Sequence, residues 1–175
     1  MTRNLYLFIF GASLPILSLA VLCVFILWVS LSAHYLGKRP WRDVNILLFA
    51  GALFFVLRYT VLFRTPNESY YISFSLLDKL RKVKTSWDLD REIYMNALLF
   101  FPLGLSFPQL IYRGSAWKAF RNTILFAFLL SFCIEFLQYA LSLGNAEMSD
   151  LVFNTMGAAI GALPVLIAGK IKKHS

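Results

Sequence analysis

The sequence has 175 residues, enough for one compact domain, and 59% of them are hydrophobic. Only 15% are charged, against roughly a quarter in ordinary soluble domains, so a soluble protein of this composition would lack polar residues to cover its surface. The net charge of +8 comes from basic residues that lie mostly between and after apolar runs, as the positive-inside rule explains. No nucleic-acid-binding motif is present. We therefore predict an all-α, polytopic helical membrane bundle.

Five apolar runs approach the ~20 residues that a helix needs to cross the hydrocarbon core. The first is longer than the ~7–15 apolar residues of a cleaved signal peptide, so we expect it to be retained. The second is stopped at Thr65-Pro66, because a residue before proline is pushed out of the helical region. The third contains Pro102 and Gly104, which neighbouring helices tolerate in a membrane bundle. The predicted spans are 5–31, 44–63, 93–112, 119–143 and 151–169.

The connection between the second and third spans, residues 64–92, has a pattern of its own. Ile72, Leu76, Leu80 and Val83 recur at helical spacing, with aromatic residues near one end and basic residues near the other. This pattern predicts one amphipathic helix that lies in the membrane interface. The alternative is a loop whose aromatic side chains only touch the lipid head groups.

Five spans place the two chain termini on opposite sides of the membrane. The side that bears the C-terminus collects nine basic residues, against seven on the other side. The short connections at 37–42 and 113–121 are basic, whereas the turn at 144–149 has no basic residue. Because basic residues near span ends decide orientation, we predict a cytoplasmic C-terminus and an N-terminus outside.

Polar residues and glycines recur on one face of each of the last two predicted spans. The four positions in each span are separated by four, three and four residues, which places them on one side of a helix. They are Ser131, Glu135, Gln138 and Ser142 in the fourth span, and Asp150, Asn154, Gly157 and Gly161 in the fifth. The glycines allow a neighbouring helix to approach closely.

Further polar groups lie at a similar depth. Glu92 and Asn96 open the third span, and Arg58 lies within the second, which Arg64 closes. At 1.5 Å per residue, Glu135 lies ~12 Å from the end of its span and Arg58 ~9 Å from Arg64. Charged groups at such depth are costly and usually paired, so we predict that Glu135 and Arg58 face one another or share one cavity in the outer half of the bilayer. The alternative is that these polar contacts only hold the helices together.

Together these residues predict a polar pocket in the outer half of the bilayer. Its candidate ligand-binding residues are Arg58, Arg64, Glu92, Asn96, Glu135, Gln138, Asp150 and Asn154. The arginines suit an anionic head group. Glu135 and Asp150 are the candidate catalytic residues, as an acid and base or as ligands of a divalent cation. No signature singles out a reaction, and neither a cofactor nor a defined metal site is predicted.

Three segments resemble the VanZ-like family: NALLFFPLG (96–104), IEFLQYALSLG (134–144) and SDLVFNTMGAAIG (149–161). The family pattern runs N-x-x-x-F-x-P-x-G, then E-x-x-Q, then D-x-x-x-N-T-x-G-x-x-x-G. The matching residues are Asn96, Phe100, Pro102, Gly104, Glu135, Gln138, Asp150, Asn154, Thr155, Gly157 and Gly161. The resemblance covers about residues 44–170. The chain departs from it at Ala146-Glu147, where the family often has a basic or polar residue followed by Asp.

The resemblance implies a VanZ-like four-helix core at 44–170, preceded by an N-terminal helix and basic loop at 1–43 and followed by a basic tail at 171–175. It also implies a bacterial plasma-membrane protein of the cell envelope, because members of the family are linked with reduced susceptibility to teicoplanin and related lipoglycopeptides.

We expect such a protein to engage an amphipathic or lipid-linked envelope molecule, or the lipoglycopeptide itself, among membrane lipids and without nucleic acid. One alternative is a membrane enzyme that modifies a lipid-linked head group through Glu135 and Asp150. A second is a small lipid transporter, against which the lack of an inverted repeat argues. The oligomeric state is left open.

Overall fold

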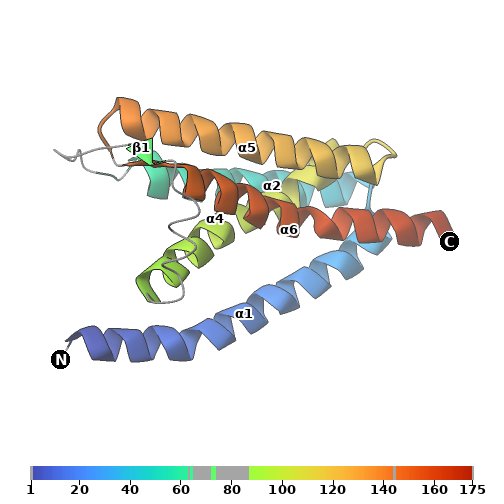
Figure 1. Cartoon of the computed structure of the whole chain (residues 1–175). Coiled ribbons are helices and arrows are strands. Elements are labelled where there is room, and N and C mark those ends of the chain that lie inside the picture. The colour runs from blue at the N-terminus through green and yellow to red at the C-terminus, as the bar shows by residue number, and fades with distance from the viewer. Residues whose placement is uncertain (1, 63, 65–71, 74–86, 144, 175) are drawn as a thin grey trace.

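The computed structural model describes residues 2–62, 64, 72–73, 87–143 and 145–174 of the chain. Most of the described residues form long helices. These helices are α1 (Thr2–Tyr35), α2 (Arg39–Leu57), α4 (Trp87–Ile111), α5 (Ala116–Ala140) and α6 (Met148–His174). Helices α2, α5 and α6 run nearly along one direction, while α4 crosses them obliquely (Figure 1). A short π-helix, η1 (Arg58–Leu62), continues α2. Two short strands, β1 (Ile72–Ser73) and β2 (Ala146–Glu147), pair in parallel.

Within the described residues, five helices are long and apolar enough to cross a membrane. The predicted all-α membrane bundle is therefore confirmed, and the chain is a multi-pass helical membrane protein. Its candidate spans are Ile16–Tyr35, Arg39–Leu62, Ile93–Ile111, Ala116–Ala140 and Met148–Lys173. The helices run a few residues beyond most predicted boundaries, because polar residues continue a helix past the apolar part that hydropathy detects.

The two ends of the bundle differ in what they hold. One end, called here the N-side, carries the N-terminus, η1 and the two strands, and the opposite end, the C-side, carries the C-terminus (Figure 1). The turns between α1 and α2 and between α4 and α5 also lie on the C-side. The end of α2 with η1, the start of α4, the end of α5 and the start of α6, which carry the predicted pocket residues, all lie in the N-side half (Figure 1). Which side faces the cytoplasm stays a prediction.

The closest helix contact joins α4 to α6. At three glycines an added Cβ would collide with the backbone carbonyl of the facing residue. The three pairs are Gly104 with Ala158, Gly157 with Ala97, and Gly161 with Phe101. The expectation that Gly157 and Gly161 admit a neighbouring helix is therefore confirmed, and α4 supplies a glycine in return. Because the backbones touch, this seam fixes the relative position of α4 and α6.

An apolar core lies beside this seam and joins the other helices to it. Its buried members include Val56 of α2, Phe100 and Leu103 of α4, Ile134 of α5 and Ala158 of α6. Phe100, the aromatic residue of the 96–104 motif, is fully enclosed. Four helices thus form one packed unit.

Helix α1 is fixed to this unit at its C-side half. The Trp28 indole donates to the Leu105 carbonyl at 3.0 Å. The Gln109 amide donates to the Ser32 hydroxyl at 3.0 Å and accepts from the Trp41 indole at 3.1 Å. Toward its N-terminus α1 diverges from the other helices (Figure 1). Polar side chains therefore hold the C-side end of α1 against the other helices, whereas its N-side end lies apart from them.

Helix α5 ends at Ala140, three residues before the predicted end of the span. Ser142 adopts a left-handed conformation with φ of 55°, and the Leu143 amide donates back to the Gln138 carbonyl at 2.8 Å. This pattern is a Schellman C-cap, which closes a helix by reversing the chain. The prediction that Ser142 continues the polar stripe is therefore wrong.

The predicted interfacial helix is contradicted at its first position. Ile72 lies in β1 and pairs with Ala146 of β2, so its backbone is extended. A partner 74 positions further along the chain competes here with the local helical spacing. Leu76, Leu80 and Val83 lie outside the described residues. Helix α4 begins at Trp87, six residues before the predicted span.

Candidate functional site

The site is built around a polar stripe on α5. Ser131, Glu135 and Gln138 are all buried, as the helical spacing predicts, and they face α6, β2 and η1. Glu135 is only 8% exposed and Gln138 only 2%. A polar stripe so enclosed needs partners from neighbouring elements, because buried polar groups without hydrogen bonds are strongly destabilising.

Glu135 finds its hydrogen-bond partner in the backbone of β2. Its Oε2 accepts from the Glu147 N–H at 2.9 Å. Asp150 and Glu147 would repel a carboxylate at this position, whereas Arg64 attracts it. The predicted pairing of Glu135 with Arg58 stays a prediction. The strand β2 positions the Glu147 amide for this contact, since its pairing with β1 holds the turn before α6.

Gln138 closes the end of η1. Its Nε2 donates to the Thr60 carbonyl at 2.9 Å, and the Thr60 hydroxyl donates to the Val56 carbonyl at 2.7 Å. The last four carbonyls of a helix have no partner within the helix, so a buried side-chain donor is needed here. Gln138 therefore has a structural task in addition to its place in the candidate site.

Two asparagines flank the α4–α6 seam on the N-side. The Asn154 amide donates to the Ser131 hydroxyl at 2.9 Å, which links α6 to α5. Its Oδ1 is buried and has no hydrogen-bond partner within the described part of the chain, and the same holds for Asn96 Nδ2. One acceptor and one donor are thus left for a molecule that enters this region.

An acidic group gathers where β2 leads into α6. The Ser149 hydroxyl lies 3.2 Å from a Glu147 carboxylate oxygen and 3.4 Å from Asp150 Oδ1. Ser149 is buried, and Asp150 lies in the first turn of α6, where the helix dipole favours a negative charge. Glu147 and Ser149 were not among the predicted site residues. In the sequence, the only indication of these residues was that Glu147 and Asp150 lie close together in the turn before the last span.

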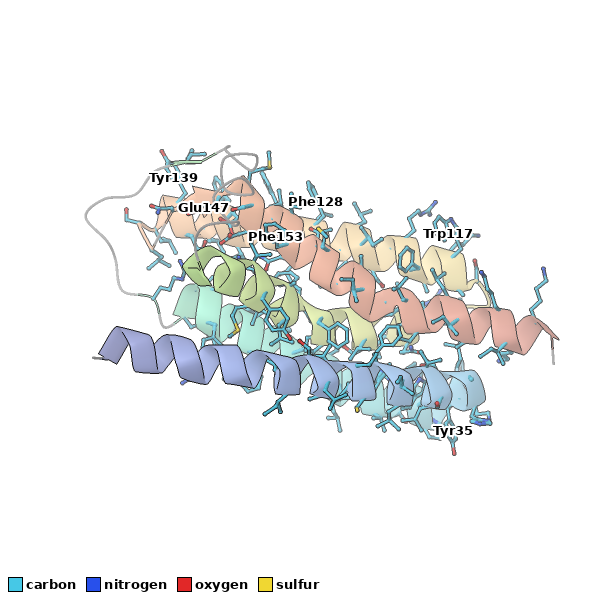
Figure 2. The ribbon with its side chains drawn as sticks, turned by 60° about the horizontal axis from the view of Figure 1, so that its bottom comes forward. Tyr35, Trp117, Phe128, Tyr139, Glu147 and Phe153 are labelled. Atoms are coloured by element: carbon cyan, nitrogen blue, oxygen red, sulfur yellow. The ribbon has the colours of Figure 1, made fainter. Side chains whose placement is uncertain are left out.

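A cavity of about 240 Å³ opens beside this acidic group. Glu135 and Glu147 are its acidic lining residues, and Ile72 of β1 closes one side. Nearly all of the surface that faces the cavity is apolar. The remaining lining is Phe132, Phe136, Tyr139, Ala146, Met148 and Leu151. Glu147 and Tyr139 lie at the same end of the bundle, far from Tyr35 and Trp117 (Figure 2). We call this cavity the Glu135 pocket.

The other predicted site residues are distributed around it. Arg58 is half-buried on η1, Arg64 is exposed, and Asn96 lines a second, larger cavity that also includes Arg64. Glu92 lies in α4, and its side chain is outside the described residues. Within the described residues, no group of three or more His, Cys, Asp and Glu side chains is arranged to hold a metal ion.

A family profile described as VanZ/LLP1 matches residues 16–169. The chain belongs to the VanZ/LLP1 family. The match begins within α1, upstream of the region 44–170 that the motifs indicate. Comparison with curated proteins and with solved structures gave no match.

The structure gives the family motifs a physical meaning. The motif residues Gly104 of α4 and Gly157 and Gly161 of α6 form the close seam between the two helices. Asn96 and Asn154 are the motif asparagines that flank it. The E-x-x-Q motif supplies the two α5 side chains that bind the backbones of β2 and η1. The VanZ/LLP1 motifs therefore hold the helices together and also shape the N-side pocket.

Proposed function

We propose that this VanZ/LLP1-family protein acts in the bacterial cell envelope and lowers susceptibility to teicoplanin-type lipoglycopeptides. It does so by engaging an amphipathic or lipid-linked envelope molecule in the Glu135 pocket at the outer side of the plasma membrane. Family membership supports the envelope role. The orientation rests on the distribution of basic residues along the sequence.

The observation that carries the proposal is the composition of the Glu135 pocket. Two acidic residues, Glu135 and Glu147, border a cavity whose accessible wall is almost entirely apolar. A pocket of this kind suits a molecule that offers hydrogen-bond donors, such as hydroxyl, amide or ammonium groups, next to an apolar part. Lipoglycopeptides and lipid-linked wall precursors both combine such donors with a hydrocarbon chain.

A second candidate function is an enzyme that modifies a lipid-linked head group. The closeness of Glu135, Glu147 and Asp150 favours this enzymatic function. Neighbouring carboxyl groups in different environments bind a proton with different strength, so one can act as the proton donor and another as the proton acceptor. Both candidates use the same pocket, so they differ in whether a covalent change takes place.

The test compares growth inhibition by teicoplanin in strains that carry the native protein, Asp150→Asn or the control Asp43→Asn. Asp43 is an exposed acid on the C-side end of α2. We expect Asp150→Asn to abolish resistance at equal protein level and Asp43→Asn to preserve it. Equal resistance in both variants would contradict the proposal.

Mass spectrometry of envelope lipids and wall precursors then separates the two candidates. We expect the same covalent species with and without the protein, together with reduced antibiotic binding. A species that appears only with the native protein and is lost in Asp150→Asn would establish the enzyme in place of the binding protein.

A further inference from the structure

A second cavity lies between α1, α2 and α4 on the N-side half of the bundle. Its volume is about 930 Å³, near the upper end of the ~300–1,000 Å³ that ligand pockets occupy. Helix α1 contributes Leu17, Ala20, Val21, Val24 and Trp28, whose spacing places them on one face of the helix. We call this cavity the α1 groove. It exists because α1 is clamped at Gln109 and diverges toward its N-terminus (Figure 1).

The depth of the α1 groove matches one leaflet of a bilayer. Leu17 and Trp28 line it on α1, and Met95 and Ser106 line it on α4. Each pair spans ~16 Å at 1.5 Å per residue, which is about half of the ~30 Å hydrocarbon core. The bond from Trp28 to the Leu105 carbonyl lies at the deep end. A hydrocarbon chain from one leaflet therefore fits along the groove.

Polar groups lie at the end of the groove nearest the N-side. Arg64, two residues beyond η1, brings a guanidinium group, and Asn96 on α4 brings an amide whose buried nitrogen has no partner within the described part of the chain. The walls below them are mainly apolar. An arginine pairs well with a phosphate through two parallel hydrogen bonds. The groove therefore has a positively charged group at its N-side end and mainly apolar walls along the rest of its length.

We propose that the α1 groove holds one hydrocarbon chain of a membrane lipid whose anionic phosphate head group binds Arg64. Charge complementarity favours an anionic lipid. A zwitterionic lipid would place its own positively charged group close to Arg64, which would repel it. The groove is separate from the Glu135 pocket, so this inference goes beyond the proposed function. Arg64 lines the groove and is not among the residues that line the Glu135 pocket.

The test uses the purified full chain in mixed micelles with equal amounts of phosphatidylglycerol and phosphatidylcholine that carry identical acyl chains. Native mass spectrometry counts the lipids that stay bound. We expect one phosphatidylglycerol per chain and about a tenfold preference for it over phosphatidylcholine. Arg64→Gln should remove the preference, and Arg64→Lys should largely keep it. Equal retention of the two lipids by the native chain would overturn the role of Arg64.

A matched pair of variants tests the groove itself. Gly51 lines the groove, and a Cβ added there meets nothing within 4 Å, so Gly51→Trp fills the groove without a clash at the backbone. Ala50, its neighbour on α2, is exposed and outside the groove lining. We expect Gly51→Trp to lose the bound lipid and Ala50→Trp to retain it.

Ala20→Trp narrows the same groove from the side of α1 and should behave like Gly51→Trp. Thermal unfolding of each variant identifies the folded samples that enter the comparison. Retention of phosphatidylglycerol by folded Gly51→Trp or Ala20→Trp at the native level would overturn the proposal. Because the readout is bound lipid, the result is independent of whether the protein confers resistance.

Discussion

Replacement of Glu135 by glutamine separates the chemistry of the Glu135 pocket from its packing. The amide oxygen of glutamine can accept from the Glu147 N–H in place of the carboxylate Oε2, which lies 2.9 Å away in the native chain. The substitution keeps the size of the side chain and removes its capacity to ionise. It also removes the attraction to Arg64 and the repulsion by Asp150 and Glu147.

The expected change in stability is small. A hydrogen bond to a charged acceptor contributes ~1.5–3 kcal/mol and one to a neutral acceptor ~0.5–1.5 kcal/mol, so the loss is about 1–1.5 kcal/mol before the relief of repulsion offsets part of it. Glu135→Ala is different, because it leaves the Glu147 N–H without its acceptor. A buried donor left unpaired costs ~1–3 kcal/mol, so alanine should destabilise the protein more than glutamine.

The assay combines thermal unfolding of detergent-purified protein with teicoplanin susceptibility measured at matched protein level. We expect Glu135→Gln to unfold near the native temperature and to abolish resistance. Two results would refute the reasoning. Full resistance in Glu135→Gln would remove Glu135 from the functional site. A loss of resistance that follows the amount of folded protein would make Glu135 a structural residue.

Three further variants and one fusion probe the fold and its orientation. Gln138→Ala leaves the Thr60 carbonyl without its side-chain donor, so the free energy of unfolding should fall by ~1–3 kcal/mol in thermal or denaturant unfolding. Gly157→Val drives a side chain into the Ala97 carbonyl and should cost ~3 kcal/mol or more, whereas Gly51→Val, in open space, should remain folded. A reporter enzyme fused to the C-terminus should be active in the cytoplasm, and activity outside would reverse the predicted orientation.

Helical periodicity predicted much of the fold and part of the site. The buried stripe of Ser131, Glu135 and Gln138 follows directly from positions along one regular helix. Gly157 and Gly161 were likewise recognised as contact positions from their spacing. Such predictions succeed because each concerns residues within a single element, whose geometry the sequence determines locally.

Whether Glu135 and Arg58 face one another stays a prediction, because depth in the membrane does not fix the direction of a side chain. Arg58 starts η1, where the chain changes from α-helical to π-helical turns. A π-helical turn contains more residues than an α-helical turn, so directions extrapolated from α2 do not hold for residues further along η1. The pairing of β1 with β2 joins residues 74 positions apart, and no local pattern reports such a contact.

The α4–α6 seam also limits how mutations in this protein can be rescued. At Gly104, Gly157 and Gly161 the atoms that an added side chain meets are backbone carbonyls. A carbonyl is present whatever residue occupies the facing position, so shortening the opposite side chain creates no room. A suppressor of Gly157→Val should therefore not arise at Ala97. Second-site revertants should instead map to residues that set the spacing of the two helices, and true reversion to glycine should dominate a selection for restored function.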